Sequence, residues 1–173
     1  TYTTAITHAA LLAAADLAEV SNDPDSAVKW RSAAGDIHTA AQKTLYNHDK
    51  KAFYKGITVA KDGTVGYDDT VDFSSVFGSF MYGLFPVASD ENRSAVATAE
   101  KLFGVNDTTC GIPRYEFDSY LRANKDGPGN LWFVTSLWLA QYYLETNQKS
   151  KAERILKWVR DSAWATGVLA EQI

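Results

Sequence analysis

Glu171 is the residue of this 173-residue chain best suited to acid–base chemistry. It follows a loop of small residues that begins at Gly167 and precedes Gln172. A carboxylate on such a loop can take a proton from water, which is the general-base step of hydrolysis with inversion. Taken alone, a glutamate this close to the end of a chain is more often solvated surface, and that alternative stays open.

A second segment, residues 112–116, has the polar and aromatic make-up of a sugar pocket. The guanidinium fork of Arg114, with the carboxylates of Glu116 and Asp118, can hydrogen-bond to neighbouring hydroxyls of a sugar. The ring of Tyr115 can stack on the apolar face of a sugar. The alternative is structural, because Arg114 and Glu116 could instead form a local ion pair that tethers the loop.

Trp132 stands in the first turn of a predicted buried helix, close to the mouth of this loop. A tryptophan there can form the floor of a carbohydrate subsite through its apolar face and its donating indole nitrogen. A core tryptophan at a helix end is the alternative. Trp138, Trp158 and Trp164 fall within predicted helices, where we expect core packing.

Composition excludes several other classes of function. A hydrophobic share of 46% and a net charge of -4 describe a globular chain without the clustered basic residues that nucleic acids require. No apolar run reaches the length that spans a bilayer. The three histidines are scattered and Cys110 is alone, so the sequence predicts neither a metal site nor a cofactor. The acidic run at 68–72 is interpreted as a helix cap.

Six helices are expected to position these residues. They are predicted at about 4–20, 25–46, 70–84, 90–103, 131–146 and 149–164, with short strands at 52–54 and 57–59 around a turn at 61–63. The helices at 70–84 and 131–146 are apolar on all sides, whereas those at 25–46, 90–103 and 149–164 are amphipathic. This alternation indicates an inner and an outer layer of paired helices.

Three motifs of the sequence resemble motifs of the glucoamylase family, glycoside hydrolase family 15, and they follow one another in the same order. The helix at 4–11 resembles the one that follows the catalytic acid of that family. The segment Pro113-Arg114-Tyr115-Glu116, followed by Asn130-Leu131-Trp132, resembles its arginine–tyrosine segment, although Leu131 replaces the usual proline. Residues 167–172 resemble the loop that carries its catalytic base.

The resemblance implies an all-α fold, an (α/α)6 toroid of inner and outer helices with a short hairpin in a loop. It implies exo-acting, inverting hydrolysis of α-glucosidic linkages in an oligo- or polysaccharide, without a cofactor. Glu171 would be the general base. Arg114, Tyr115 and Glu116 would hold the sugar, and Trp132 would wall the pocket.

The resemblance also implies that residues 1–173 are one partial domain. The Trp-Glu-Glu segment that carries the acid in the family is absent from the sequence. We therefore expect an inactive fragment whose partner is the missing half of the domain or another copy of itself. Glucodextranase or trehalase activity, or a non-catalytic toroid that binds carbohydrate or protein, are the alternatives.

Overall fold

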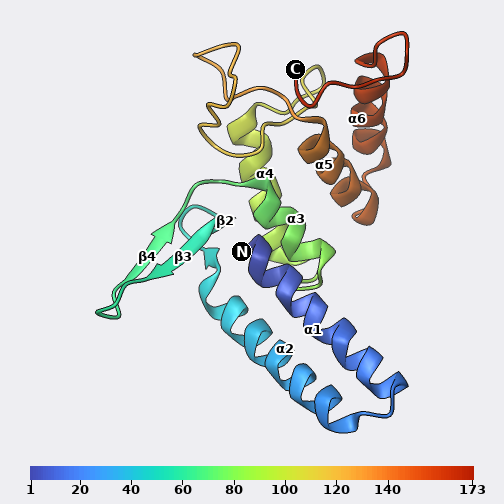
Figure 1. Ribbon diagram of the computed structural model, residues 1–173. Helices are drawn as coiled ribbons and strands as arrows, with labels where there is room; N and C mark the ends of the chain where they lie inside the picture. The colour runs from blue at the N-terminus through green and yellow to red at the C-terminus, as the bar shows by residue number, and fades with distance from the viewer.

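The computed structural model describes residues 1–173 as six α-helices joined by turns, two small hairpins and long loops (Figure 1). The helices are α1 (Tyr2–Val20), α2 (Pro24–Thr44), α3 (Phe73–Met81), α4 (Asp90–Phe103), α5 (Phe133–Glu145) and α6 (Lys149–Asp161). The strands are β1 (Tyr46–Asn47), β2 (Ala52–Phe53), β3 (Gly56–Val59) and β4 (Val65–Asp68). No helix combines the length and apolar character needed to cross a membrane.

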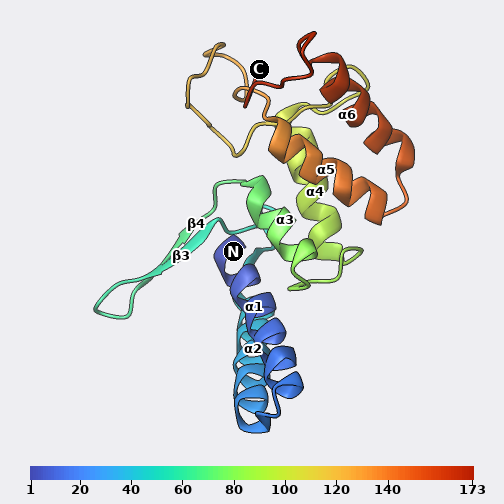
Figure 2. The same ribbon diagram turned by 45° about the vertical axis from the view of Figure 1, so that its right-hand side comes forward.

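The helices form two rows. One row holds α1, α3 and α5, in which α3 packs against both of the others, and α2, α4 and α6 each pack behind the helix that precedes them. Figure 2 shows the three helix pairs from the side. In the contact between α3 and α5, the rings of Phe77 and Trp138 stack with centroids 4.5 Å apart. The arrangement confirms the predicted all-α fold of paired inner and outer helices.

Burial follows this layering. Seven of the nine residues of α3 are buried, whereas α6 buries only Ala152 and Ile155. An inner helix has neighbours on several sides, while an outer helix keeps one face in water. The alternation of apolar and amphipathic helices in the sequence therefore has the predicted cause.

Local signals set both ends of α4 and the start of α2. The Ser89 hydroxyl caps α4 by accepting the Asn92 amide at 3.2 Å, and Gly104 ends the helix with a φ of 70°. Asp23 caps α2 in the same way, with Pro24 in the first turn. These signals are typical of helix starts and ends.

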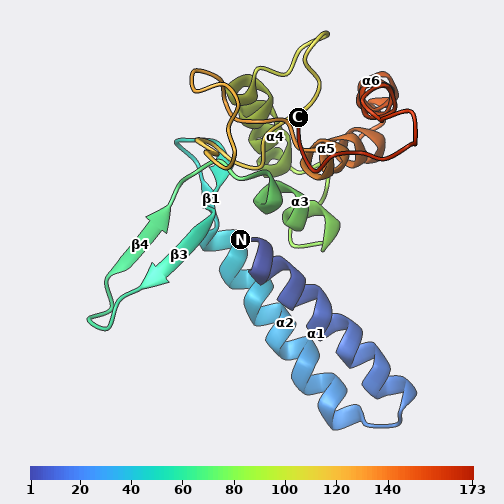
Figure 3. The same cartoon turned by 45° about the horizontal axis from the view of Figure 1, so that its top comes forward.

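The hairpins differ in pairing from the predicted one. The strand at 52–53 pairs with β1, and β3 pairs instead with β4 around the turn at 60–64. The β3–β4 hairpin projects from the body of the molecule (Figure 3).

Another correction concerns Trp164, which lies beyond the end of α6 with 69% of its surface exposed. Core packing was expected for that residue and is wrong.

Candidate active site

The N-terminal ends of α3 and α5 are linked through residues 112–115, which form an isolated β-bridge with the N-cap residue of each helix. Asp72, the N-cap of α3, forms an antiparallel bridge with Tyr115. Trp132, the N-cap of α5, forms one bridge with Ile112 and a second with Gln172. The arginine–tyrosine segment, the start of α5 and the C-terminal loop therefore lie side by side. These three segments carry Arg114, Trp132 and Glu171, which the sequence singled out as candidate site residues.

Backbone hydrogen bonds hold the arginine–tyrosine segment in place. The Phe73 amide donates to the Arg114 carbonyl at 3.0 Å, and the Glu116 amide donates to the Val71 carbonyl at 2.8 Å. The bridge is confined to Tyr115, and a turn begins at Glu116. These bonds tie the segment to the residues at the start of α3.

Arg114 is held by a forked ion pair with Asp118. Its Nε donates to Asp118 Oδ2 at 2.8 Å, and its Nη2 donates to Asp118 Oδ1 at 2.9 Å. Asp118 is almost fully buried, with 1% of its side chain exposed, whereas Arg114 retains 31%. The pair fixes the plane of the guanidinium and leaves part of it open to a ligand.

Each member of this pair stabilises the charged form of the other. Hydrogen bonding to Arg114 lowers the pKa of the Asp118 carboxyl below its ordinary value, against the opposing effect of burial. Hydrogen bonding to Asp118 raises the pKa of the Arg114 guanidinium, and the nearby charge of Glu171 adds to that rise. Both groups are therefore charged at neutral pH.

Aromatic rings surround the guanidinium. Its central carbon lies 4.0 Å from the ring centroid of Trp132, 5.1 Å from that of Tyr120 and 5.3 Å from that of Tyr115. Trp132 is 4% exposed, so its ring supports Arg114 from within. The indole Nε1 of Trp132 and the side-chain Oε1 of Gln172 are both buried without a hydrogen-bond partner.

Arg114, its partner Asp118 and the rings of Tyr115, Tyr120 and Trp132 are called the Arg114 cluster below. The C-terminal segment, which carries Glu171, pairs with the chain beside this cluster. The amide of Ile173 donates to the Leu131 carbonyl at 2.9 Å, and the amide of Leu131 donates to the Ile173 carbonyl at 2.7 Å. Glu171 is exposed, yet it is close enough for its charge to act on Arg114. A carboxylate that is both hydrated and near a fixed guanidinium can accept a proton from water beside a bound ligand.

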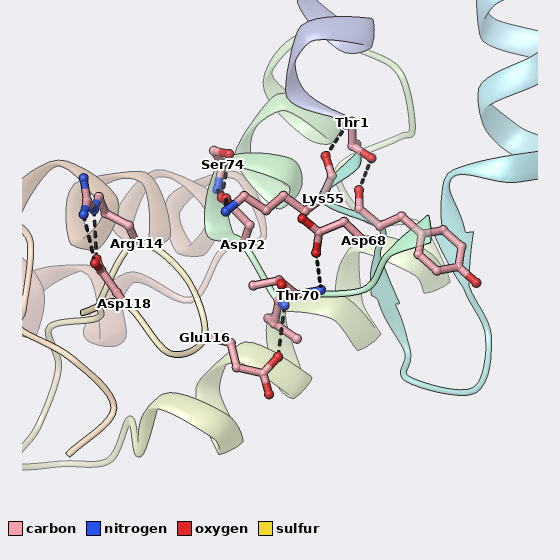
Figure 4. Close-up of polar contacts among 11 residues, drawn as sticks. Thr1, Lys55, Asp68, Thr70, Asp72, Ser74, Arg114, Glu116 and Asp118 are labelled. Atoms are coloured by element: carbon pink, nitrogen blue, oxygen red, sulfur yellow. Dashed lines mark hydrogen bonds and ion pairs between the residues drawn. The ribbon is translucent and has the colours of Figure 1, made fainter. Parts of the chain in front are cut away.

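Glu116 lies apart from this cluster. Its Oε2 accepts from Lys50 Nζ at 2.8 Å and from the Val71 amide at 3.2 Å. In Figure 4 its carboxylate points away from the Arg114–Asp118 pair. The ion pair between Arg114 and Glu116 that was considered as a structural alternative is absent, and Asp118 takes that place.

No feature of the sequence indicated that Lys55 lies at this site. Its Nζ lies 3.9 Å from the ring centroid of Tyr115 and 3.4 Å from Asp72 Oδ2. Its carbonyl accepts from the amino group of Thr1 at 2.9 Å (Figure 4). Asp72 also accepts the Ser74 amide at 2.8 Å, which confirms the capping role predicted for the acidic run.

The family profile described as Glycosyl hydrolases family 15 matches residues 1–163. The chain belongs to glycosyl hydrolase family 15. An uncharacterized glycosyl hydrolase of Methanocaldococcus jannaschii is 28% identical over 142 residues, which make up 82% of this chain and 21% of that protein. The chain thus spans about a fifth of the length of the curated relative.

Solved structures share the fold. A bacterial glucoamylase complexed with acarbose has a TM-score of 0.76 at 18% identity, and the match covers 99% of this chain and 29% of the glucoamylase chain. A glycosidase carrying the substitution E335A, in complex with glucose, has a TM-score of 0.75 at 21% identity, and the match covers 99% of this chain and 41% of the glycosidase chain. The family 15 chain therefore has the helical architecture of these enzymes over nearly its full length.

Proposed function

We propose that this chain is part of a catalytic domain that hydrolyses α-glucosidic linkages from the non-reducing end with inversion. Glu171 acts as the general base, and Arg114 and Tyr115 hold the sugar at the cleavage point. Trp132 keeps the guanidinium in position. The supporting observation is the bridge between Trp132 and Gln172. Glu171 directly precedes a residue that pairs with Trp132, and the Trp132 ring lies 4.0 Å from the Arg114 guanidinium.

The chemistry follows from that juxtaposition. In an inverting hydrolase, a carboxylate deprotonates water on one face of the sugar while an acid protonates the leaving oxygen on the other. The fork held by Asp118 presents donors to sugar hydroxyls, and the hydrated Glu171 can activate the water. We assign Glu116 no contact with the sugar at the cleavage point, because its Oε2 pairs with Lys50 and its carboxylate points away from Arg114.

The proton donor is proposed to come from residues outside this chain. The chain covers 29% and 41% of the two structural neighbours, and a base without an acid cannot protonate the leaving oxygen. We therefore expect no glucose release from maltose by residues 1–173 alone. Glucose release by the purified chain, free of other glycosidases, would refute this part of the proposal.

Substitution of Glu171 tests the proposed base. In the longer protein that contains this chain, Glu171→Gln should lower kcat by about 10²- to 10⁴-fold while sugar binding stays nearly unchanged. Glu153→Gln, at an exposed position on α6, is the matched control and should leave kcat unchanged. Proton NMR of the first product should show β-glucose. Unaltered turnover in Glu171→Gln would contradict the assignment.

A further inference from the structure

A groove lies on the side of the 114–118 loop where Glu116 points, away from the Arg114–Asp118 pair. It consists of two hollows of about 370 and 420 Å³ that share Leu102 and Glu116. The other lining residues used below are Lys50, Lys101, Phe117, Arg122 and Asp126. Hollows of this size are typical of small-ligand sites.

Phe117 forms the exposed rim of this groove. Its backbone has a φ of 63°, which bulky residues rarely adopt. Its neighbours enforce the turn, because Glu116 is paired with Lys50 on one side and Asp118 with Arg114 on the other. The result is an aromatic residue with 76% of its surface exposed. An exposed aromatic ring on a strained but firmly anchored backbone is a reason to look for a ligand.

The groove also holds polar groups with unused bonding capacity. Glu116 accepts Lys50 and Val71 through Oε2, so Oε1 remains free to accept a further bond. Arg122 uses its Nε on the Asn124 carbonyl at 2.9 Å, which leaves its terminal nitrogens free to donate. Donors and acceptors therefore lie along the same groove, next to the exposed ring.

The mixture of charges defines the class of ligand. The two hollows are lined by three cations (Lys50, Lys101, Arg122) and two carboxylates (Glu116, Asp126), and each hollow contains charges of both signs. An anion would therefore meet at least one carboxylate in either hollow, whereas a hydroxyl can donate to one group and accept from another at the same time. A sugar ring also has an apolar face that packs on an aromatic side chain. We propose that this groove binds a neutral oligosaccharide, which stacks on Phe117 and hydrogen-bonds to Glu116 and Arg122.

The proposal does not depend on the hydrolytic function. Phe117 and Arg122 take no part in the Arg114 cluster, so loss of either side chain should leave the sugar affinity of that cluster unchanged. The chain has five tryptophans, so only the part of a sugar-induced fluorescence change that is lost in Trp132→Phe reports on the Arg114 cluster, where Trp132 contacts the guanidinium. Ligand binding in the groove is instead followed by native electrophoresis in gels that contain soluble dextran or starch, and by calorimetry with maltoheptaose.

Phe117→Gly separates binding from stability. Glycine adopts a φ of 63° without strain, so this variant should melt at the same temperature as the unaltered chain or slightly higher. Loss of the ring should nevertheless weaken binding of the oligosaccharide by about 2- to 10-fold. Arg122→Ala should weaken it as well. Tyr67→Ala, which removes an exposed aromatic ring from β4, is the matched control and should bind normally.

Four results would overturn the proposal. The first is that the unaltered chain is not retarded by the neutral glucans. The second is that Phe117→Gly binds as tightly as the unaltered chain. The third is that Arg114→Ala abolishes the retardation while Phe117→Gly does not, because the binding would then belong to the Arg114 cluster. Retardation by dextran sulfate alone would assign the groove to anions and would also contradict the proposal.

Discussion

Arg114 and Asp118 form the ion pair on which the geometry of the site depends. The pair could not be identified from the sequence, which places two carboxylates, Glu116 and Asp118, at similar separations from the arginine. The left-handed backbone at Phe117 decides between them, because it turns the chain between the two carboxylates. Such a turn carries no sequence signal when the residue is phenylalanine rather than glycine or asparagine.

Asp118→Asn should destabilise the fold by about 1–3 kcal/mol at neutral pH, because it removes a charged partner from a buried, doubly bonded contact. Urea unfolding followed by circular dichroism measures the change. Asp107→Asn is the control, since Asp107 pairs with Arg154 at the surface and its side chain is 90% exposed. We expect less than about 0.5 kcal/mol there.

The pH dependence of the Asp118 contribution has a definite sign. The pKa of Asp118 is lower in the folded chain than in the unfolded one, so the unfolded state takes up the proton first as the pH falls. The stabilisation is therefore complete above the ordinary aspartate pKa of about 3.9 and is lost below it. The difference between the unaltered chain and Asp118→Asn should shrink in acid. A constant difference down to the acid limit would contradict the role of the ionised pair.

At the scale of the elements, the prediction succeeded where the signals are local. The outer helix α4 begins and ends where the sequence placed it, because Ser89 and Gly104 act on their own helix. The inner helix α5 begins two residues later than expected. Leu131 and Trp132 are extended because they pair with the C-terminal segment and with Ile112, and those partners are distant in the sequence.

The approach of α6 to the arginine–tyrosine loop makes Gly111 a sensitive position. A methyl group on Gly111 would lie 2.8 Å from the Trp158 ring and 3.1 Å from Leu131 Cβ. Gly111→Ala should therefore cost about 1–3 kcal/mol through overpacking. Gly35→Ala is the matched change, because nothing lies within 4 Å of its added Cβ inside α2.

Gly35→Ala should stabilise the chain by about 0.5–1 kcal/mol, since alanine favours a helix interior. The two alanine substitutions are thus expected to change the free energy of unfolding in opposite directions, as measured by urea titration. If Gly111→Ala unfolded at the same urea concentration as the unaltered chain, the packing of Trp158 against this loop would be wrong.

At the scale of the whole molecule, the inner row of helices has faces that no other element covers. A groove of about 380 Å³ between α5 and α6 is lined by apolar side chains, among them Val134, Leu144 and Leu156. Each of these three is roughly half exposed. Apolar surface of this kind in a contiguous patch is typical of an interface. We propose that the remainder of a family 15 domain, or a second copy of this chain, covers it.

The isolated chain is therefore expected to associate with itself. Sedimentation velocity over a wide range of concentrations should show oligomers, and the association should persist at high NaCl concentration because the patch is apolar. Replacing Leu144 and Leu156 together by Gln removes about 2 kcal/mol of burial, which corresponds to about 30-fold weaker association. Val28→Gln, a change at an exposed valine on α2, should have no effect. A monomer at every concentration with a cooperative melt would show that the groove between α5 and α6 needs no partner.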